Sequence, residues 1–400
     1  MKITIVVGGR WHAFDLARQL QSHGHLHRLI TNYPRWYVTR WGIPAEKVVS
    51  LPLTFWVIKA IYKIGGEALM MRYQWRVHNW FAQRAVNHLE GSELIHGWSQ
   101  WSEPSLKWAR NRGITTVLER SSAHILEQSR LLREEYERLG LHWPPTHPKI
   151  VAMELKEYKL CTSIAVPSRF VERTFREKGV NITRLNRNAL GVNLKQFEPP
   201  KEPPSPPIEV GLKVVYAGAL SVQKGVPDLL NGFHTANLPN STLTLLGGCT
   251  KELKPLLDAQ PESVKRLGHR PQTELVRHYQ TAHCFVIASI QEGMAMVQMQ
   301  ALACGLPIIC SEHTGGEDLL RLQGAKGKLS NQGIAEFPAG FVVPIHKPEA
   351  IAYCLQRLQR EPELWKGMRE AALELANSEL NWSAYGARAI SHYNSLLEAK

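Results

Sequence analysis

The chain has 400 residues, of which 44% are hydrophobic and 21% charged, a composition that excludes disordered and collagen-like proteins. This length predicts two domains, each large enough to bury a core without disulfides or metals. The six cysteines include no CxxC pair, which argues against a zinc ribbon or a thioredoxin-type site, so we expect reduced core cysteines in a cytoplasmic protein.

The formal net charge of +13 lies entirely in the first half of the chain. Residues 1–200 hold 29 Lys and Arg against 16 Asp and Glu, whereas residues 201–400 hold 19 of each. Between residues 28 and 84, nine basic residues stand among many Trp and Tyr residues and only two acidic ones. Such a surface attracts anionic partners, and this mixture suits a membrane–water interface.

We therefore expect residues 28–84 to contact an anionic membrane or an anionic acceptor, with a solvated basic face as the alternative. No RNP, KH or zinc-knuckle signature is present, so we expect no nucleic acid partner. The N-terminus shows no signal-peptide pattern, and no window holds about 18 apolar residues in a row. The richest window, 51–66, is interrupted by Lys59 and Lys63. These features predict a cytoplasmic protein that works at the inner face of the membrane.

The first residues read as strand, glycine turn, helix and strand. An apolar run at 3–7 precedes Gly8-Gly9, a helical pattern extends from about 13 to 23, and a second strand covers about 26–31. This order is typical of the βαβ unit of a doubly wound sheet. Later segments are predicted as strands at 93–97, 115–119 and 163–167 and as an amphipathic helix at 125–139.

A proline-rich segment at 198–212 marks the clearest boundary, and its prolines argue against helix or central strand. After it the βαβ pattern begins again, with strands predicted at 213–218, 241–248, 283–289 and 306–310. We therefore predict an α/β protein with two Rossmann-like, doubly wound domains that face each other across a cleft. The domains span 1–197 and 213–380, and a closing helix over 381–400 packs back toward the first domain.

Ligands of such sheets bind beyond the carboxyl ends of the strands, so the loops there are informative. Gly8 and Gly9 could let a ligand approach the backbone closely, since glycine has no side chain. The alternative is that they only form a tight turn between the strand and the helix. Their motif, GGRWHAF, is not GxGxxG and predicts no dinucleotide. After the strand at 213–218, Gly218 is followed by Lys224, which can neutralise a diphosphate or be a solvated lysine.

The most specific segment is SIQEGMAMVQMQALACGLPIICSEHTGGEDLL at 289–320. A strand ends at Ser289, and a glutamate and a glycine then open a helix. Glu292 is expected at the mouth of the cleft, and the N–H groups of Gly293 to Met296 are expected to face a phosphate.

This segment resembles the nucleotide-sugar motif of retaining GT-B glycosyltransferases of the family-4 type, the glycosyl transferases group 1. YAGALSVQKGVPDLL at 216–230 is similar to the family's glycine–x–x–lysine–glycine loop. Three further segments resemble parts of the family's first domain. Residues 118–136 resemble an acceptor-domain loop, and residues 166–179 resemble a recurrent unit of strand, serine and helix. Residues 190–199 resemble the segment that closes the first domain. The resemblance implies a basic acceptor domain at 1–197 and a nucleotide-sugar domain at 213–380.

The resemblance also implies the roles of single residues. Lys224 would bind the donor diphosphate, Glu292 would hold hydroxyls of the donor sugar, and His124 would lie near the reacting sugar, unless it is a core or capping histidine. These three are the expected catalytic residues. Donor-binding roles are implied for Gly8, Gly9, Gly218, Lys224, Arg270, Glu292, Gly293, Met294, Ala295, Met296 and Gln300.

Three positions depart from the family pattern. Gln300 stands where the family has a second Glu, Ala219 where it often has an Arg on the diphosphate, and Asn193 where Asp is common. Gln can still bond ribose hydroxyls, but without charge. A replacement for the missing cation could come from Arg10, Arg120 or Arg270.

The implied function is retaining transfer of a sugar from a nucleoside-diphosphate sugar to a glycan or lipid-linked acceptor in polysaccharide, lipopolysaccharide or glycolipid synthesis. No DxD motif is present to hold a metal, so we expect no cofactor and no metal. Two alternatives stay open. One is an epimerase or hydrolase of nucleotide sugars on the same fold, and the other is a non-catalytic protein that binds them.

Overall fold

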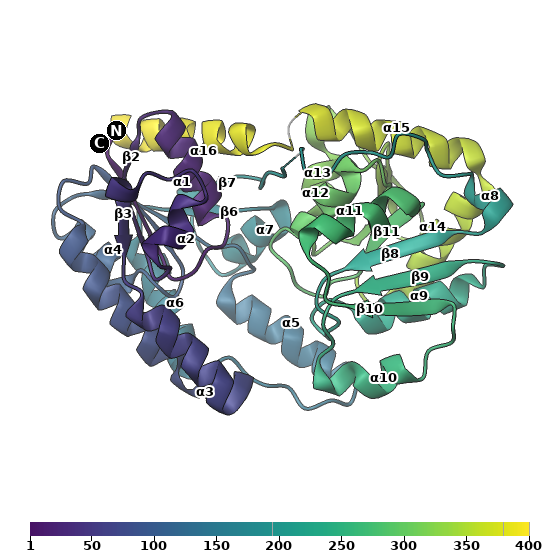
Figure 1. Ribbon diagram of the computed structural model, residues 1–400, viewed down its shortest axis with the longest axis horizontal. Coiled ribbons are helices and arrows are strands. Elements are labelled where there is room, and N and C mark those ends of the chain that lie inside the picture. Colours follow the sequence, from purple (N-terminus) through teal and green to yellow (C-terminus); the bar gives the residue numbers. More distant parts are fainter. Residues whose placement is uncertain (194, 379, 400) are drawn as a thin grey trace.

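The computed structural model describes residues 1–193, 195–378 and 380–399, and it places them in two α/β domains side by side (Figure 1). Each domain has one central sheet with helices on its faces, as the sequence predicts. The strands of both sheets are mostly parallel and buried, so their sequences are runs of Val, Ile and Leu rather than alternating patterns.

The N-terminal sheet has seven parallel strands in the order β3-β2-β1-β4-β5-β6-β7. The strands are β1 (Ile3–Val7), β2 (Leu26–Thr31), β3 (Val48–Ser50), β4 (Leu94–Trp98), β5 (Thr115–Glu119), β6 (Ser163–Val166) and β7 (Leu185–Arg187). The helices are α1 (Ala13–Ser22), α2 (Arg35–Thr39), α3 (Leu53–Ala85), α4 (Glu103–Arg110), α5 (Ile125–Arg138), α6 (Pro148–Leu160) and α7 (Arg169–Glu177). Reversal of the strand order at β1 and β4 is the doubly wound arrangement.

The C-terminal sheet repeats this topology in the order β10-β9-β8-β11-β12-β15-β14-β13, with β13 and β14 as an antiparallel extension. Its strands are β8 (Lys213–Ala217), β9 (Thr242–Leu246), β10 (Val264–Gly268), β11 (Cys284–Ile287), β12 (Ile308–Ser311), β13 (Lys328–Leu329), β14 (Ala335–Phe337) and β15 (Gly340–Val343). The helices are α8 (Pro207–Val210), α9 (Val226–Ala236), α10 (Lys254–Asp258), α11 (Gln272–Thr281), α12 (Met296–Ala303), α13 (Gly316–Leu320), α14 (Pro348–Arg360) and α15 (Pro362–Ser378).

The proline-rich segment is not extended throughout, contrary to the sequence prediction. Its last residues form the one-turn helix α8, which begins at Pro207. Proline is tolerated at the first position of a helix because its missing N–H would have no intrahelical partner there.

The helix α3 is broken at Gly66, whose φ of 63° and ψ of −153° are not helical. Glycine adopts such a positive φ without the steric cost that a Cβ would impose. Among the residues that the structure describes, no helix is both long and apolar enough to cross a membrane.

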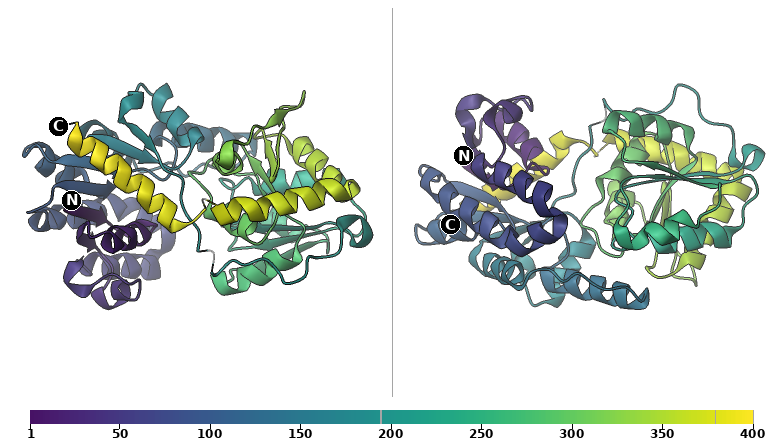
Figure 2. Two further views of the ribbon diagram at one scale, coloured as in Figure 1. Left: turned by 90° about the horizontal axis from the view of Figure 1, so that it is seen from above. Right: turned by 60° about the horizontal axis from the view of Figure 1, so that its bottom comes forward.

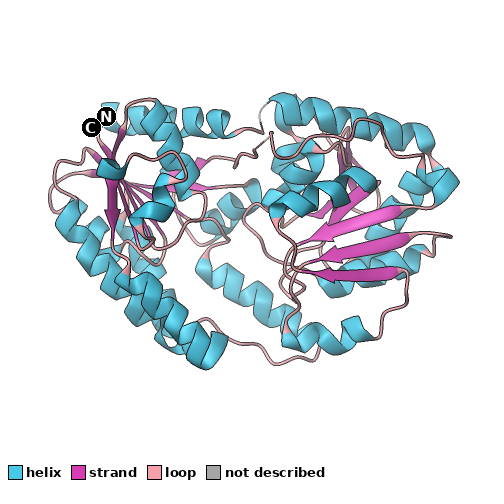
Figure 3. Cartoon of the chain, in the orientation of Figure 1, coloured by secondary structure: helices cyan, strands magenta, loops and turns pink. Residues whose placement is uncertain are grey.

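The two domains face each other through the carboxyl ends of the C-terminal strands. In Figure 3 the arrowheads of β8, β9 and β10 point toward the N-terminal domain. The last helix, α16 (Trp382–Glu398), returns to that domain, so α15 and α16 lie over different domains (Figure 2). There α16 packs on α1, and Tyr393 Oη lies 2.7 Å from Nδ1 of the buried His96.

Candidate active site

Lys224 and Glu292 meet at the carboxyl edge of the C-terminal sheet. Lys224 follows β8 and Glu292 follows β11, and these strands are neighbours in the sheet. The Lys224 ammonium forms an ion pair with the Glu292 carboxylate, and both side chains keep about a fifth of their surface exposed. Burial lowers the pKa of Lys224 to about 8. The structure thus brings together two of the residues that the sequence singled out, and their roles toward a ligand stay predictions.

Gly225 explains why the Lys224 loop lies so close to β11. A Cβ at this position would lie 1.8 Å from the carbonyl oxygen of Ala288, and the residue has a φ of 63° at the start of α9. Only glycine fits both conditions, so the loop that carries Lys224 is fixed against the neighbouring strand end.

The loop that follows Glu292 lies against the N-terminal domain. The Ser168 hydroxyl donates to the carbonyl oxygen of Gly293 over 2.7 Å, and a Cβ on Gly293 would lie 1.8 Å from the carbonyl oxygen of Ser121. The Gln291 amide donates to the Ser122 hydroxyl, and the backbone N–H of Leu190 lies 3.4 Å from the Met294 sulfur. The segment at 289–296 is thus part of the boundary between the domains.

The backbone amides of this loop only partly match the predicted phosphate site. The helix α12 begins at Met296, later than the Glu-Gly pair suggested. The N–H of Ala295 donates to the carbonyl oxygen of Thr314 over 3.1 Å, so this amide does not face a ligand, and that prediction was wrong. The loop after β12 folds back on this segment, which a sequence pattern does not reveal.

Gln300 lies on α12 and is buried, with 3% of its surface exposed. Its side-chain oxygen has no hydrogen-bond partner among the described residues. A buried polar atom without a partner is costly, so it points to a group that the protein receives from outside. The hydrogen bond between Gln300 and a ribose hydroxyl, in which this oxygen would be the acceptor, stays a prediction.

The glycine residues of the predicted donor site serve different purposes. A Cβ on Gly8 would overlap the Trp101 ring at 1.9 Å, so glycine is required here by the packing of Trp101. Gly218 has a φ of 149°, which favours glycine. Its carbonyl oxygen would lie 1.7 Å from a Cβ on Gly247, so the two glycine residues pack closely against each other. Gly9 has a φ of 141°, which likewise favours glycine.

His124 is the capping residue of α5. Its Nδ1 accepts the N–H of Leu126 at 3.3 Å, and its ring contacts the rings of Tyr158 and Phe175. Burial lowers the pKa of His124 to about 4, so the ring is neutral at neutral pH. The structure therefore favours the capping alternative for this histidine.

Three arginines were considered as replacements for the arginine that the family often has at position 219, and they lie in different surroundings. Arg120 is buried and pairs with Glu154 at 3.2 Å, so it is already neutralised. Arg270 follows β10, is exposed and lies 3.5 Å from Glu274. The Arg10 guanidinium lies 4.6 Å from the centre of the Trp41 ring, on the loop after β1.

A cavity of about 810 Å³ lies in the N-terminal domain between the β1 loop and α3. Its walls include residues that the sequence did not single out, among them Asn32, His78, Gln100 and Trp101. These four come from three separate segments, so no local pattern could have linked them.

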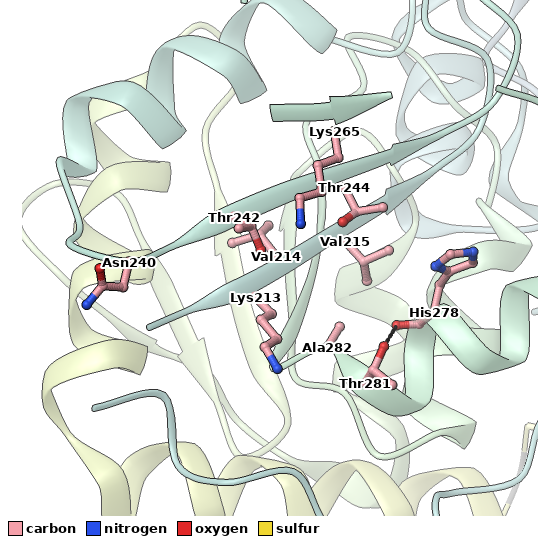
Figure 4. A pocket seen from close by; sticks show the side chains of 10 residues that line it. All are labelled: Lys213, Val214, Val215, Asn240, Thr242, Thr244, Lys265, His278, Thr281 and Ala282. Atoms are coloured by element: carbon pink, nitrogen blue, oxygen red, sulfur yellow. Dashed lines mark hydrogen bonds between the residues drawn. The ribbon is translucent and has the colours of Figure 1, made fainter. Parts of the chain in front are cut away.

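A smaller cavity of about 210 Å³ lies in the C-terminal domain (Figure 4). Lys213 and Thr242, at the amino ends of β8 and β9, contribute to its lining. It therefore lies at the sheet edge opposite to Lys224, on the wrong side for a ligand held by the Lys224 loop.

A group of potential metal ligands occurs away from Lys224. Oxygen and nitrogen atoms of Glu135, Asp228 and His346 lie within 4.8 Å of one another. The Arg138 guanidinium already pairs with both carboxylates, at 2.7 and 2.8 Å. A cation at this position would compete with an arginine, so we assign these residues to the contact between the domains.

Residues 211–361 match the family described as glycosyl transferases group 1. The amylovoran biosynthesis glycosyltransferase AmsK of Erwinia amylovora is 26% identical over 183 residues, which are 43% of this chain and 43% of that protein. The C-terminal domain of this chain is therefore similar to the glycosyl transferases group 1. The AmsK match thus covers less than half of either chain.

Two solved structures share the fold over nearly the whole chain. Sucrose-phosphate synthase from Thermosynechococcus elongatus superposes with a TM-score of 0.68 at 18% identity and covers 100% of both chains. HepE of Anabaena, in complex with UDP, superposes with a TM-score of 0.67 at 13% identity over 99% of this chain and 100% of that one. The predicted GT-B fold, with two Rossmann-like domains, is confirmed.

Proposed function

We propose that the protein transfers a sugar from a nucleoside-diphosphate sugar to a glycan or lipid-linked acceptor in polysaccharide, lipopolysaccharide or glycolipid synthesis. The observation that carries the proposal is the Lys224–Glu292 pair, which lies where the donor motif meets the N-terminal domain. The similarity to an amylovoran glycosyltransferase supports a polysaccharide product, and the similarity to a protein solved with UDP supports a nucleotide-sugar donor.

Lys224 and Glu292 would act on different parts of the donor. Breaking the bond between sugar and diphosphate leaves negative charge on the phosphate, and a fixed cation stabilises this charge more in the transition state than in the ground state. When the diphosphate binds, the Lys224 ammonium turns from Glu292 to the phosphate, and the carboxylate becomes free to accept bonds from sugar hydroxyls. We propose that transfer retains the anomeric configuration and needs no metal.

We also propose that the protein works at the inner face of the membrane and contacts it through α3. Trp56, Tyr62 and Ile64 on the first half of this helix are exposed, together with Lys59 and Lys63. Exposed aromatic and aliphatic side chains beside lysines suit the boundary between lipid and water. A lipid-linked acceptor would be presented at the same boundary.

A thermal-shift screen with UDP-, GDP-, ADP- and TDP-sugars tests the donor assignment. A donor at 100 times its Kd stabilises the native state by about 2.7 kcal/mol, so we expect one class of nucleotide to raise the Tm by several degrees. Lys224→Ala or Glu292→Ala should remove the shift or the turnover, whereas Lys254→Ala, an exposed change in the same domain, should leave both unchanged.

The assignment fails if none of the four nucleotide classes shifts the Tm. Release of free sugar without any acceptor, at the rate seen with one, would favour the hydrolase alternative. Tight nucleotide binding with no transfer across an acceptor panel would favour the non-catalytic alternative.

A further inference from the structure

Another cavity of the N-terminal domain lies at the amino edge of its sheet. It has a volume of about 550 Å³ and is lined by Ile114, Thr115 and Thr116 at the start of β5 and by Thr162 and Arg184, which precede β6 and β7. The last turns of α4, α6 and α16 complete its walls. Because the proposed donor site lies at the carboxyl ends of strands, this cavity is a separate place in the fold.

Three cations line this cavity, whereas no described carboxylate does. They are Arg110 at the end of α4, Lys159 in the last turn of α6 and Arg184 before β7. None of the three forms an ion pair within the part of the chain that the structure describes. Positive charges gathered in one hollow without a counter-charge repel each other, and a bound anion removes this repulsion.

The Arg184 guanidinium is held in place before any ligand arrives. Its Nη2 donates to the carbonyl oxygens of Tyr158 at 2.6 Å and Cys161 at 2.7 Å, and its Nε donates to that of Thr162 at 3.4 Å. These bonds also offset the negative end of the α6 dipole. The remaining nitrogen, Nη1, has no partner among the described residues, so a preorganised donor is left for an anion.

Threonine hydroxyls add neutral hydrogen-bond donors to the same cavity. The side-chain oxygens of Thr116 and Thr162 each accept the backbone N–H of the other residue, at 2.9 and 3.1 Å, and they lie 3.3 Å apart. Only one of these two hydroxyls can donate to the other, so one proton is left for a ligand. The hydroxyl of Thr115, a residue with 4% of its surface exposed, has no partner among the described residues.

The size of the cavity and its aliphatic wall call for more than an inorganic anion. A water molecule occupies about 30 Å³, so about 550 Å³ leaves room for an organic body beside a phosphate group. This volume is in the range of small-molecule sites, about 300–1,000 Å³. Ile114, Leu160 and Leu396 supply aliphatic surface against which the carbon skeleton of such a body can pack.

We propose that this cavity binds a small phosphorylated molecule of the sugar phosphate or polyol phosphate class. The phosphate lies between Arg110, Lys159 and Arg184, and the hydroxyl groups of the ligand bond to the threonines. A phosphate monoester carries a charge of about −1.5 to −2 at pH 7, which the three cations compensate. The proposal does not depend on the transfer reaction, because none of the residues that bind the phosphate belongs to the proposed donor site.

Isothermal titration calorimetry at low salt with glucose 6-phosphate tests the proposal, with inorganic phosphate and glucose as comparison probes. We expect glucose 6-phosphate to bind more tightly than inorganic phosphate, and glucose not to bind. Arg110→Gln and Lys159→Gln should each weaken binding about 2- to 10-fold, a value reduced by the exposure of both side chains. Arg176→Gln, an exposed change on α7, should leave binding unchanged.

The Tm of each variant shows whether it folds. Both side chains are exposed and unpaired, so Arg110→Gln and Lys159→Gln should keep the Tm of the unmodified protein. Weaker binding with an unchanged Tm would support a role in binding the ligand, whereas weaker binding that follows a loss of folded protein would overturn it.

Three further outcomes would overturn the proposal: no binding of glucose 6-phosphate, equal binding by the variant that carries both changes, or equal affinity for inorganic phosphate. Lys224→Ala should bind glucose 6-phosphate like the unmodified protein, and loss of binding in this variant alone would place the ligand in the proposed donor site instead. The proposed function fails separately, since the absence of any nucleotide-sugar binding would leave the titration with glucose 6-phosphate unchanged.

Discussion

Lys224 combines a partly buried ammonium with a carboxylate neighbour, and in the proposed reaction a diphosphate takes the place of that neighbour. Burial lowers its pKa to about 8, so a small rise in pH removes the charge on which the proposed donor site depends. An arginine at the same position would keep its charge, because the guanidinium pKa is above about 12. The residue therefore predicts how donor binding depends on pH.

We expect nucleotide-sugar affinity to fall as the pH rises from about 7 to about 9. The free protein holds Lys224 charged below its pKa and neutral above it, so binding at high pH must first recover a proton. Lys224→Arg should bind the donor with an affinity that is flat across this range. Calorimetric titrations at several pH values measure both profiles, and a flat profile for the unmodified protein would contradict the assignment.

Lys224 and Glu292 could be located from the sequence because each lies in the loop after a parallel strand, and the carboxyl ends of such strands share one edge. Asn32 and His78 could not be located from the sequence. Their common property is the absence of a partner in a cavity built from distant segments. Similarly, the bond from Ala295 to Thr314 depends on the path of a loop that no periodicity describes.

At the scale of elements, the strands at the centre of each sheet were the most predictable. The apolar runs at β1, β2 and β5 match the predicted bounds, because buried parallel strands leave a continuous apolar signal. The edge strand β3 has only three residues and gives no such signal. The long helix α3 was not predicted as a unit, since it is exposed over its first half and broken at Gly66.

The exposure of α3 leads to a prediction on lipid binding. Reversing the charges of Lys59, Lys63, Arg72 and Arg76 should weaken binding to anionic liposomes strongly, since each basic residue near such a surface contributes about 1 kcal/mol. A matched set in the C-terminal domain should have little effect: Lys251, Lys254, Lys265 and Arg277, all exposed. Co-sedimentation at low and moderate salt measures both sets. Equal loss in the two sets would point to net charge instead of a specific surface.

At the scale of the whole molecule, α5 connects the two domains. Its first residues follow the Ser121–Ser122 loop, which contacts Gln291 and Gly293, and its last turn reaches the C-terminal domain. There Arg138 bonds both Glu135 and Asp228, and His346 lies 3.3 Å from Glu135. Both carboxylates are buried, so they depend on the Arg138 guanidinium for their charge to be tolerated.

We expect Arg138→Ala to lower the free energy of unfolding at pH 7 by about 1–3 kcal/mol, because it leaves two buried carboxylates poorly compensated while the arginine itself is partly exposed to solvent. Burial would raise the pKa of Asp228, but bonds to His346 and the charge of Arg138 outweigh it and hold the pKa below its usual value of 3.8. A carboxyl group with a lowered pKa stabilises the folded state above the unfolded-state pKa and loses this effect as the pH falls. The difference in the free energy of unfolding between variant and unmodified protein should therefore persist at neutral pH and shrink below about pH 4.

Arg133→Ala, an exposed change on the same helix, is the control for denaturant unfolding at both pH values. Equal losses for the two variants would mean that the α5 contact does not stabilise the arrangement of the domains.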